Sequence, residues 1–308
     1  GVKRDAETVC NLINDYINAQ SVVSGWSRAT FIKFRTLRTH FAAYNEQLTV
    51  EQLTADHLRG FTKMLIDKGF RNSYTAKTYD FLKSVLLWAK TNGRCTGDAL
   101  DTFRLRLRAT ENKEAIVYLS WPELMQLYNC QFPRPSLEQC RDVFCFCCFT
   151  GLRFSDVKKL RRSDIQADSI HVVTQKTTDA LTIELNDFSR AILDKYATDT
   201  PTAYALPVIS NAKYNEHLKE SGRIAGLDDA VKKVWYVGSE RCESVSPKWQ
   251  LLTTHVARRT FVVNALSLGI SPSVIMKWTG HADYDSMKPY IAIVEDLKRS
   301  EMAKFNRH

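Results

Sequence analysis

The sequence predicts a mainly α-helical protein of two domains, an all-α helical bundle followed by a mixed α+β domain with a small β-hairpin. The length of 308 residues suggests two domains at about 150 residues each. Helical apolar periods recur through the first hundred residues, and a single alternating β-branched stretch lies near residue 175. The content of 44% hydrophobic and 25% charged residues is ordinary for a globular protein and excludes intrinsic disorder and low complexity. No apolar run approaches the roughly 18 residues that cross a bilayer, so no membrane partner is expected.

The net charge of +9 is concentrated in the N-terminal third. Residues 1–110 hold 17 basic and 10 acidic side chains, whereas residues 111–308 hold 26 and 24. This asymmetry favours a polyanionic partner such as nucleic acid, although a solvated basic surface that serves solubility explains the charge equally well. Cys145, Cys147 and Cys148 lie in one apolar run, which fits a reducing cytosol and predicts a cytoplasmic protein.

Four amphipathic helices are expected in the first third. The first covers Glu7–Ala19, and the second covers Arg28–Asn45 with Ser27 as its N-cap. Thr54 is expected to cap a third helix that ends at Gly69, and Ser73 to cap a fourth. Four such helices with short connections predict a small bundle.

A polar, charged stretch without a helical period predicts the domain boundary. It runs from Leu105 to Ala115. We therefore expect a helical domain over 1–107, a linker over 108–115 and a second domain over 116–308.

The second domain is expected to contain both helices and a hairpin. Ser120 to Glu123 predicts a helix start with proline in the first turn, and Leu137–Gly151 is apolar enough for a buried helix. The cysteines of that helix point in different directions and lack partners at zinc-finger spacing, so core packing is favoured over a metal site. Ile170–Leu185 predicts a β-hairpin, and only helices and loops are expected after Asp187.

Two candidate functional residues lie before and within this hairpin. Arg153 follows a glycine at the end of the buried helix, where a buried guanidinium must meet an anion or a carboxylate. The alternative is a structural pair between Arg153 and Asp156. Lys176 lies in the hairpin connection, where it could reach a DNA groove or be an ordinary solvated lysine.

Two further signals lie near the C-terminus. His255 and Arg258 share a helix face, with Arg259 pointing away, which suits phosphate recognition together with proton transfer. The alternative is a helix-terminal histidine beside a surface arginine. His281 follows a glycine and precedes Tyr290 by nine residues; singly, they read as a loop histidine and a packed tyrosine.

In this order and spacing, the signals resemble the active site of the tyrosine recombinase (phage-integrase-type) family. That family has an Arg at a TGLR-like turn, a Lys on a β-hairpin, an H-x-x-R pair, a GH-like His and a Tyr about nine residues later. The matching positions are Arg153, Lys176, His255, Arg258, His281 and Tyr290. Trp278-Thr279 is a departure, because many relatives have Leu before the Gly-His. Lys158, Lys159 and Lys213 are alternatives to the hairpin lysine.

The resemblance extends into the N-terminal third. The stretches Leu53–Leu58, Asn72–Thr75 and Leu87–Ala89 look like the core-binding (SAM-like) helical domain of integrases from mobile or integrative conjugative elements of Bacteroides-type bacteria. The resemblance implies a two-domain, C-shaped clamp around DNA. Integrases of this type usually carry an additional N-terminal arm-binding domain, so the resemblance raises the expectation that this sequence is a trimmed form.

The resemblance implies a role for each site residue. Tyr290 would be the nucleophile and form a 3′-phosphotyrosyl link, while Arg153 and Arg258 would clamp the phosphate. Lys176 would be the general acid, His255 would take the tyrosine proton and His281 would hydrogen-bond the phosphate. Asp156 would orient the arginine site, and no cofactor or metal would be needed.

The resemblance also implies partners. We expect double-stranded DNA recombination sites, a homotetramer on DNA that forms a Holliday junction, a monomer in free solution and accessory DNA-bending proteins. The element would be integrated or excised, and the amphipathic segment Ile291–Phe305 would be exchanged between protomers. The alternatives are packing of this segment on its own domain, a Xer-like resolvase, a type IB topoisomerase or a non-catalytic DNA-binding regulator.

Overall fold

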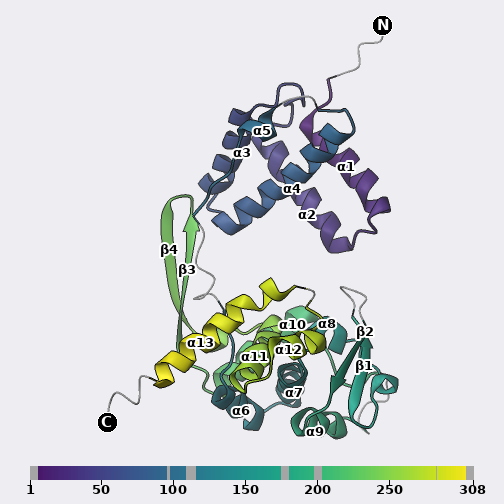
Figure 1. Cartoon of the computed structure of the whole chain (residues 1–308), viewed down its shortest axis with the longest axis vertical. Helices are drawn as coiled ribbons and strands as arrows, with labels where there is room; N and C mark the ends of the chain where they lie inside the picture. Colours follow the sequence, from purple (N-terminus) through teal and green to yellow (C-terminus); the bar gives the residue numbers. More distant parts are fainter. Residues whose placement is uncertain are drawn as a thin grey trace. The chain divides into compact units, whose positions relative to one another are not determined.

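The computed structural model describes residues 6–95, 98–108, 116–174, 180–197, 203–281 and 283–302, with the side chains of 296–301 left out. The described part is mainly helical with two small two-stranded sheets, which confirms the predicted fold class (Figure 1). The chain divides into two compact units. The first comprises Gly1–Thr110 and Val234–Glu243, and the second comprises Glu111–Lys233 and Ser244–His308. Among the described helices, none combines the length and apolar character of a membrane span.

The first unit contains the four expected helices. They are α1 (Val9–Val23), α2 (Arg28–Asn45), α3 (Ala55–Asp67) and α4 (Asn72–Thr91), followed by the short α5 (Ala99–Thr102). Ser27 caps α2 by accepting a hydrogen bond from the Thr30 amide, and Thr54 occupies the capping position of α3, as predicted. Apolar side chains from all four long helices meet in one core, including the fully buried Leu12, Phe41, Phe61 and Leu82.

The prediction that Ser73 caps the fourth helix was wrong. Helix α4 begins at Asn72, with Arg71 in the capping position. The Asn72 side chain is buried and pairs with the backbone of Gly238, donating to its carbonyl at 2.8 Å and accepting from its amide at 2.7 Å. The Arg71 guanidinium lies 4.2 Å from the centre of the Trp235 ring. A contact distant in sequence therefore fixes the start of this helix.

The expectation of only helices and loops after Asp187 was also wrong. Strands β3 (Ala230–Val237) and β4 (Glu240–Pro247) form a two-stranded sheet. The sequence signal was present, because a run rich in valine and aromatic residues precedes the two-residue connection Gly238-Ser239. Gly238 has a φ of +59°, and a Cβ at this position would lie 2.9 Å from Ile66 Cγ2, so the turn requires glycine.

The second unit is built around the buried helix α7 (Pro135–Thr150), against which α6 (Trp121–Asn129), α9 (Asp187–Lys195), α10 (Asn211–Ile224) and α11 (Thr254–Ser267) pack. The remaining elements are α8 (Phe154–Val157), α12 (Pro272–Thr279), α13 (Lys288–Met302) and 3-10 turns over Arg162–Asp164, Lys248–Leu251 and Tyr284–Ser286. The predicted hairpin is confirmed as antiparallel strands β1 (Ser169–Val173) and β2 (Ala180–Glu184). Ile170 faces Ile183 and Val172 faces Leu181, so their apolar side chains turn inward together.

The cysteines of α7 belong to the core, as the sequence indicated. Cys145, Cys147 and Cys148 are all buried, and burial raises the pKa of Cys147 to about 12, which keeps the thiol protonated. Within the described residues, no group of three or more His, Cys, Asp or Glu side chains could hold a metal ion.

The end of α7 depends on Gly151. Its φ is +73°, and a Cβ would lie 2.6 Å from Phe261 Cδ1 and 3.0 Å from Thr279 Cγ2. Both the backbone conformation and the close packing of α11 and α12 therefore exclude a larger residue here.

We expect Gly151→Ala to destabilise the protein more than Gly269→Ala. Both glycines have positive φ, so each substitution carries about 1–2 kcal/mol of left-handed strain. Only Gly151 lacks space for the methyl group, since nothing lies within 4 Å of a Cβ at Gly269. The clash should add about 1–3 kcal/mol. Urea unfolding of the two variants measures this difference, and equal losses would contradict it.

Candidate active site

Helix α7 ends in a Thr-Gly turn that leads directly to Arg153. The Thr150 hydroxyl donates to the Phe146 carbonyl at 2.7 Å, and the Gly151 amide closes the helix on the Cys147 carbonyl. Arg153 follows in extended conformation at the start of α8. Its Nη1 atom is buried and has no hydrogen-bond partner among the described residues. A buried guanidinium donor without an acceptor indicates a place for an anion.

Helix α12 also ends in a Thr-Gly turn, with the same threonine hydrogen bond and a glycine of positive φ. The Thr279 hydroxyl donates to the Ile275 carbonyl at 2.7 Å, and Gly280 has a φ of +60°. His281 follows at once, with its backbone amide bonded to the Met276 carbonyl. A Thr-Gly turn at a helix end therefore precedes each of these two residues, with Leu152 between Gly151 and Arg153.

Arg258 on α11 joins the two turns. It is only 4% exposed, and its guanidinium donates to the Gly151 carbonyl at 2.9 Å and to the Thr279 carbonyl. Its Nη2 atom also lies 3.4 Å from His281 Nε2. One buried side chain thus holds the ends of α7 and α12 beside each other.

Burial and a neighbouring positive charge both disfavour the charged form of Arg258. Burial, and then the charge of Arg153, lower the pKa of Arg258 to about 10, against smaller opposing effects of Tyr290 and Asp156. The side chain still carries its charge at neutral pH. Asp156 is buried on α8 and is near enough to contribute to this balance.

The same neighbourhood contains two histidines and a tyrosine. Burial, Arg258, Arg153 and His255 lower the pKa of His281 to about 4, so its imidazole is neutral at pH 7. His255 is exposed in the first turn of α11. Tyr290 is half-buried on α13 and packs against an apolar cluster with α11.

The structure therefore brings five of the six predicted side chains into one neighbourhood, namely Arg153, His255, Arg258, His281 and Tyr290. Lys176 lies outside the described residues, although the strands β1 and β2 on either side of it are described. Sequence reasoning missed Thr279, whose hydroxyl lies 2.7 Å from His281 Nδ1. The available signal was the Thr-Gly pair repeated at two helix ends before two candidate residues.

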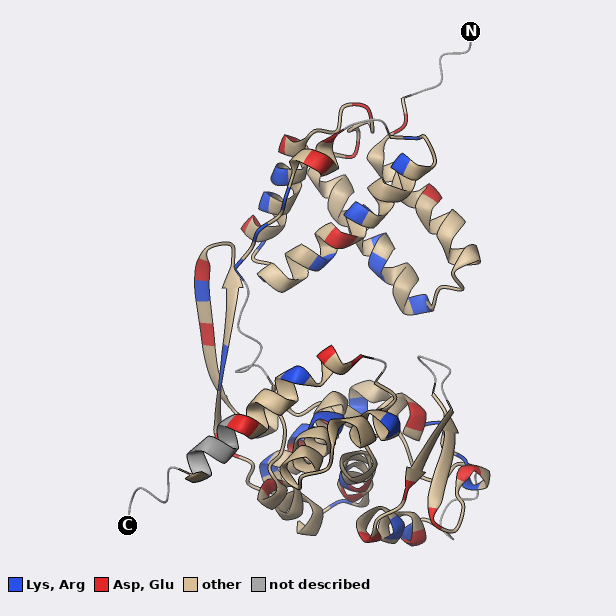
Figure 2. Cartoon of the chain, in the orientation of Figure 1, with Lys and Arg blue, Asp and Glu red and all other residues tan. Residues whose placement is uncertain are grey.

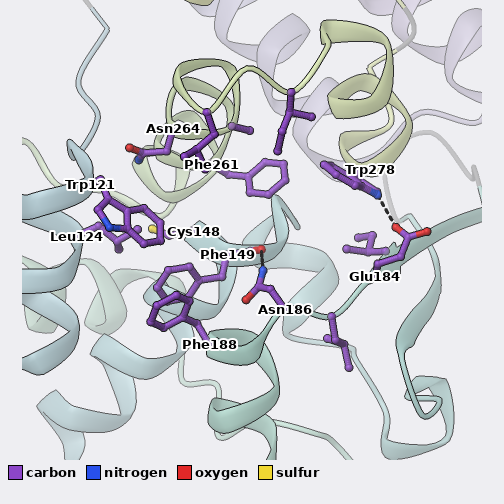
Figure 3. A pocket seen from close by; sticks show the side chains of 15 residues that line it. Trp121, Leu124, Cys148, Phe149, Glu184, Asn186, Phe188, Phe261, Asn264 and Trp278 are labelled. Carbon is purple, nitrogen blue, oxygen red and sulfur yellow. Dashed lines mark hydrogen bonds between the residues drawn. The ribbon is translucent and has the colours of Figure 1, made fainter.

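A separate apolar pocket lies in the second unit (Figure 3). It has a volume of about 350 Å³ and is lined mainly by aromatic and aliphatic side chains of α6, α7, α11 and α12 and of the segment from Ile183 to Phe188. None of the predicted site residues lines it. At one edge of the pocket the Trp278 indole donates to the neighbouring Glu184 carboxylate, which ties the end of β2 to the helix that precedes His281 (Figure 3).

The depressed pKa of His281 predicts a pH-dependent stability. The ordinary pKa of about 6.5 applies in the unfolded chain, so between about pH 6.5 and pH 4 only the unfolded state binds this proton. The contribution of His281 is therefore complete above pH 6.5 and is lost as the pH falls toward 4. Urea unfolding across this range should show a steeper loss for the wild type than for His281→Gln. Parallel curves would contradict a neutral, desolvated imidazole.

Comparison with known proteins agrees with this geometry. The family described as the phage integrase family matches residues 119–296. No curated protein matches the sequence. Among solved structures, a lambda integrase dimer bound to a COC′ core site superposes with a TM-score of 0.71 at 17% identity, covering 91% of this chain and 94% of the other.

Two further structures are similar. A lambda integrase tetramer bound to a Holliday junction has a TM-score of 0.71 at 16% identity, covering 94% of this chain and 79% of that one. The Tn1549 transposon integrase in complex with circular intermediate DNA has a TM-score of 0.69 at 14% identity, covering 96% and 99%. Since the family match spans more than half of the sequence and includes the arginine turn, the H-x-x-R pair, the Gly-His and Tyr290, the chain belongs to the phage integrase family and is a tyrosine recombinase.

Proposed function

We propose that this recombinase cleaves and rejoins double-stranded DNA through a 3′-phosphotyrosyl intermediate. The observation that carries the proposal is the pair of neighbouring guanidinium groups of Arg153 and Arg258, one of which has a buried donor without a partner. Two such cations are stable together when an anion lies between them. A scissile phosphodiester has one negative charge and two non-bridging oxygens, which suit two planar guanidinium forks.

Tyr290 is the nucleophile in this proposal. Its phenolic oxygen attacks the phosphorus and forms the new P–O bond, while the bond from phosphorus to the 5′ oxygen breaks. His255 accepts the phenolic proton, and Lys176 donates a proton to the departing 5′ oxygen. Atoms and charge balance without an external energy source, and attack by another 5′ hydroxyl reverses the step to join new strands.

The arginines supply most of the transition-state stabilisation. Charge grows on the non-bridging oxygens as phosphorus becomes five-coordinate, and fixed donors already directed at that position need no reorganisation. Asp156 supports the pair from α8 by offsetting part of the charge repulsion at Arg258. His281 completes the ring of groups around the phosphate.

DNA binding is supported by the charge of the first unit. Figure 2 shows lysine and arginine residues on α2, α3 and α4, in a segment whose net charge is +7 over residues 1–110. Contacts from such a surface fall mainly on phosphates and give affinity that decreases with salt. We propose that residues 1–107 form the core-DNA-binding domain and residues 116–308 the catalytic domain, with 108–115 as the linker.

We further infer that the reaction proceeds through a Holliday junction in a homotetramer and integrates or excises a mobile element. The solved lambda integrase tetramer on a Holliday junction and the Tn1549 transposon integrase share this fold. The N-terminal resemblance to integrases of Bacteroides-type elements favours the same role. Exchange of the segment after Tyr290 between protomers belongs to this proposal. Its first part, up to the buried Val294, packs on α11 of the same chain.

The central test of the proposal is Tyr290→Phe on a nicked suicide site. We expect the covalent protein–DNA adduct to be lost, while DNA affinity stays close to that of the wild type, because only one oxygen is removed. Tyr284→Phe is the matched control, since this exposed tyrosine lies six residues earlier and should leave the adduct intact. The readout is a denaturing gel of the adduct. An undiminished adduct in Tyr290→Phe would reject Tyr290 as the nucleophile.

A further inference from the structure

Thr279 is placed to control the protonation of His281. It is fully buried at the end of α12, and its hydroxyl oxygen is 2.7 Å from the Ile275 carbonyl and 2.7 Å from His281 Nδ1. The hydroxyl has one proton, and the carbonyl can only accept. With that proton directed at the carbonyl, the oxygen must accept from His281, so Nδ1 carries the imidazole hydrogen.

The opposite side of the ring leads to the same assignment independently. His281 Nε2 lies 3.4 Å from Arg258 Nη2, and a guanidinium nitrogen can only donate. A hydrogen on Nε2 would point at another hydrogen, whereas a lone pair on Nε2 accepts from the arginine. The lowered pKa of His281 keeps the ring neutral at pH 7, so only one of its nitrogens carries a hydrogen.

We propose that Thr279 is a positioning residue that holds His281 in the neutral tautomer with hydrogen on Nδ1 and a lone pair on Nε2. This inference rests on the proposed function for its role in the reaction. In the free protein Nε2 accepts from Arg258. Against a bound phosphate oxygen, the same lone pair is repulsive until Nε2 takes up a proton, after which it donates to that oxygen. Phosphate binding is thereby coupled to the uptake of one proton at a defined atom.

Thr279 directly precedes the Gly280-His281 pair in the sequence. Two variants separate the hydroxyl from the rest of the side chain. Thr279→Val removes the hydroxyl and keeps both the methyl near Gly151 and the backbone carbonyl that binds Arg258. Thr279→Ser keeps the hydroxyl and removes the methyl.

The test is a ¹H–¹⁵N long-range correlation spectrum of ¹⁵N-histidine-labelled full chain at pH 7, without DNA. The chain has seven histidines, and His281→Gln identifies the signal. We expect the Nδ1–H pattern in the wild type and in Thr279→Ser, and a shift toward Nε2–H in Thr279→Val. Thr150→Val, which removes the equivalent hydroxyl at the end of α7, serves as the control and should leave this signal in place.

The second readout is the rate of adduct formation on the nicked suicide site. Loss of the partner that orients a metal-bound histidine typically costs roughly 10–100-fold, and by analogy we expect a loss of this size in Thr279→Val and recovery in Thr279→Ser. An Nε2–H pattern in the wild type would overturn the proposal, as would an unchanged tautomer in Thr279→Val or an altered tautomer without a loss of rate. The spectrum needs neither DNA nor activity, so failure of the proposed function would appear separately, as an absent adduct in the wild type.

Discussion

The hydrogen bonds of the Arg258 guanidinium to two backbone carbonyls organise the second unit. They connect α11 to the turn after α7, 107 residues earlier at Gly151, and to the turn after α12, 21 residues later at Thr279. A buried arginine is costly unless each donor is satisfied. Here two carbonyls accept from the Arg258 guanidinium, while Asp156 offsets only part of the charge repulsion between Arg258 and Arg153. The same bonds that stabilise the turns therefore hold Arg258 beside Arg153, an arrangement that favours an anion between them.

The two Thr-Gly turns explain how the site is assembled from separate helices. In each, a threonine hydroxyl completes the last helical turn and a glycine in the left-handed region redirects the chain. Both glycines have positive φ, and a Cβ at Gly151 would also clash with Phe261 and Thr279, so the first turn is the less tolerant of a larger residue. Precision at the site thus comes from helix ends fixed by core packing, a more rigid support than a long loop would provide.

The motif residues could be found from the sequence because the chemistry requires fixed residue types at local spacings. The H-x-x-R pair is set by helical geometry, and the Gly before His281 by the turn that follows α12. The tertiary partners could not be found in this way. The pairing of Asn72 with Gly238 accounts for the start of α4 at Asn72, ahead of the predicted cap Ser73. It joins residues that are 166 positions apart. The role of Thr279 likewise depends on the position of Arg258 in the folded protein, and no local sequence pattern predicts that position. The missed β3–β4 hairpin is a different case. Its strand and turn signals were present in the sequence, so it could have been predicted locally.

A comparison of charged and neutral scissile groups tests most directly whether Arg258 neutralises the charge of the scissile phosphate. Cleavage rates of the wild type and Arg258→Met would be measured on two suicide sites that differ only in the scissile group, a natural phosphate or a neutral methylphosphonate. We expect the substitution to slow cleavage of the natural site by about 10²–10³-fold and cleavage of the neutral site far less, because the charge that the arginine neutralises is absent. The comparison is made within each variant, so any loss of folded protein cancels. Equal slowing on both sites would contradict a phosphate bound between Arg153 and Arg258.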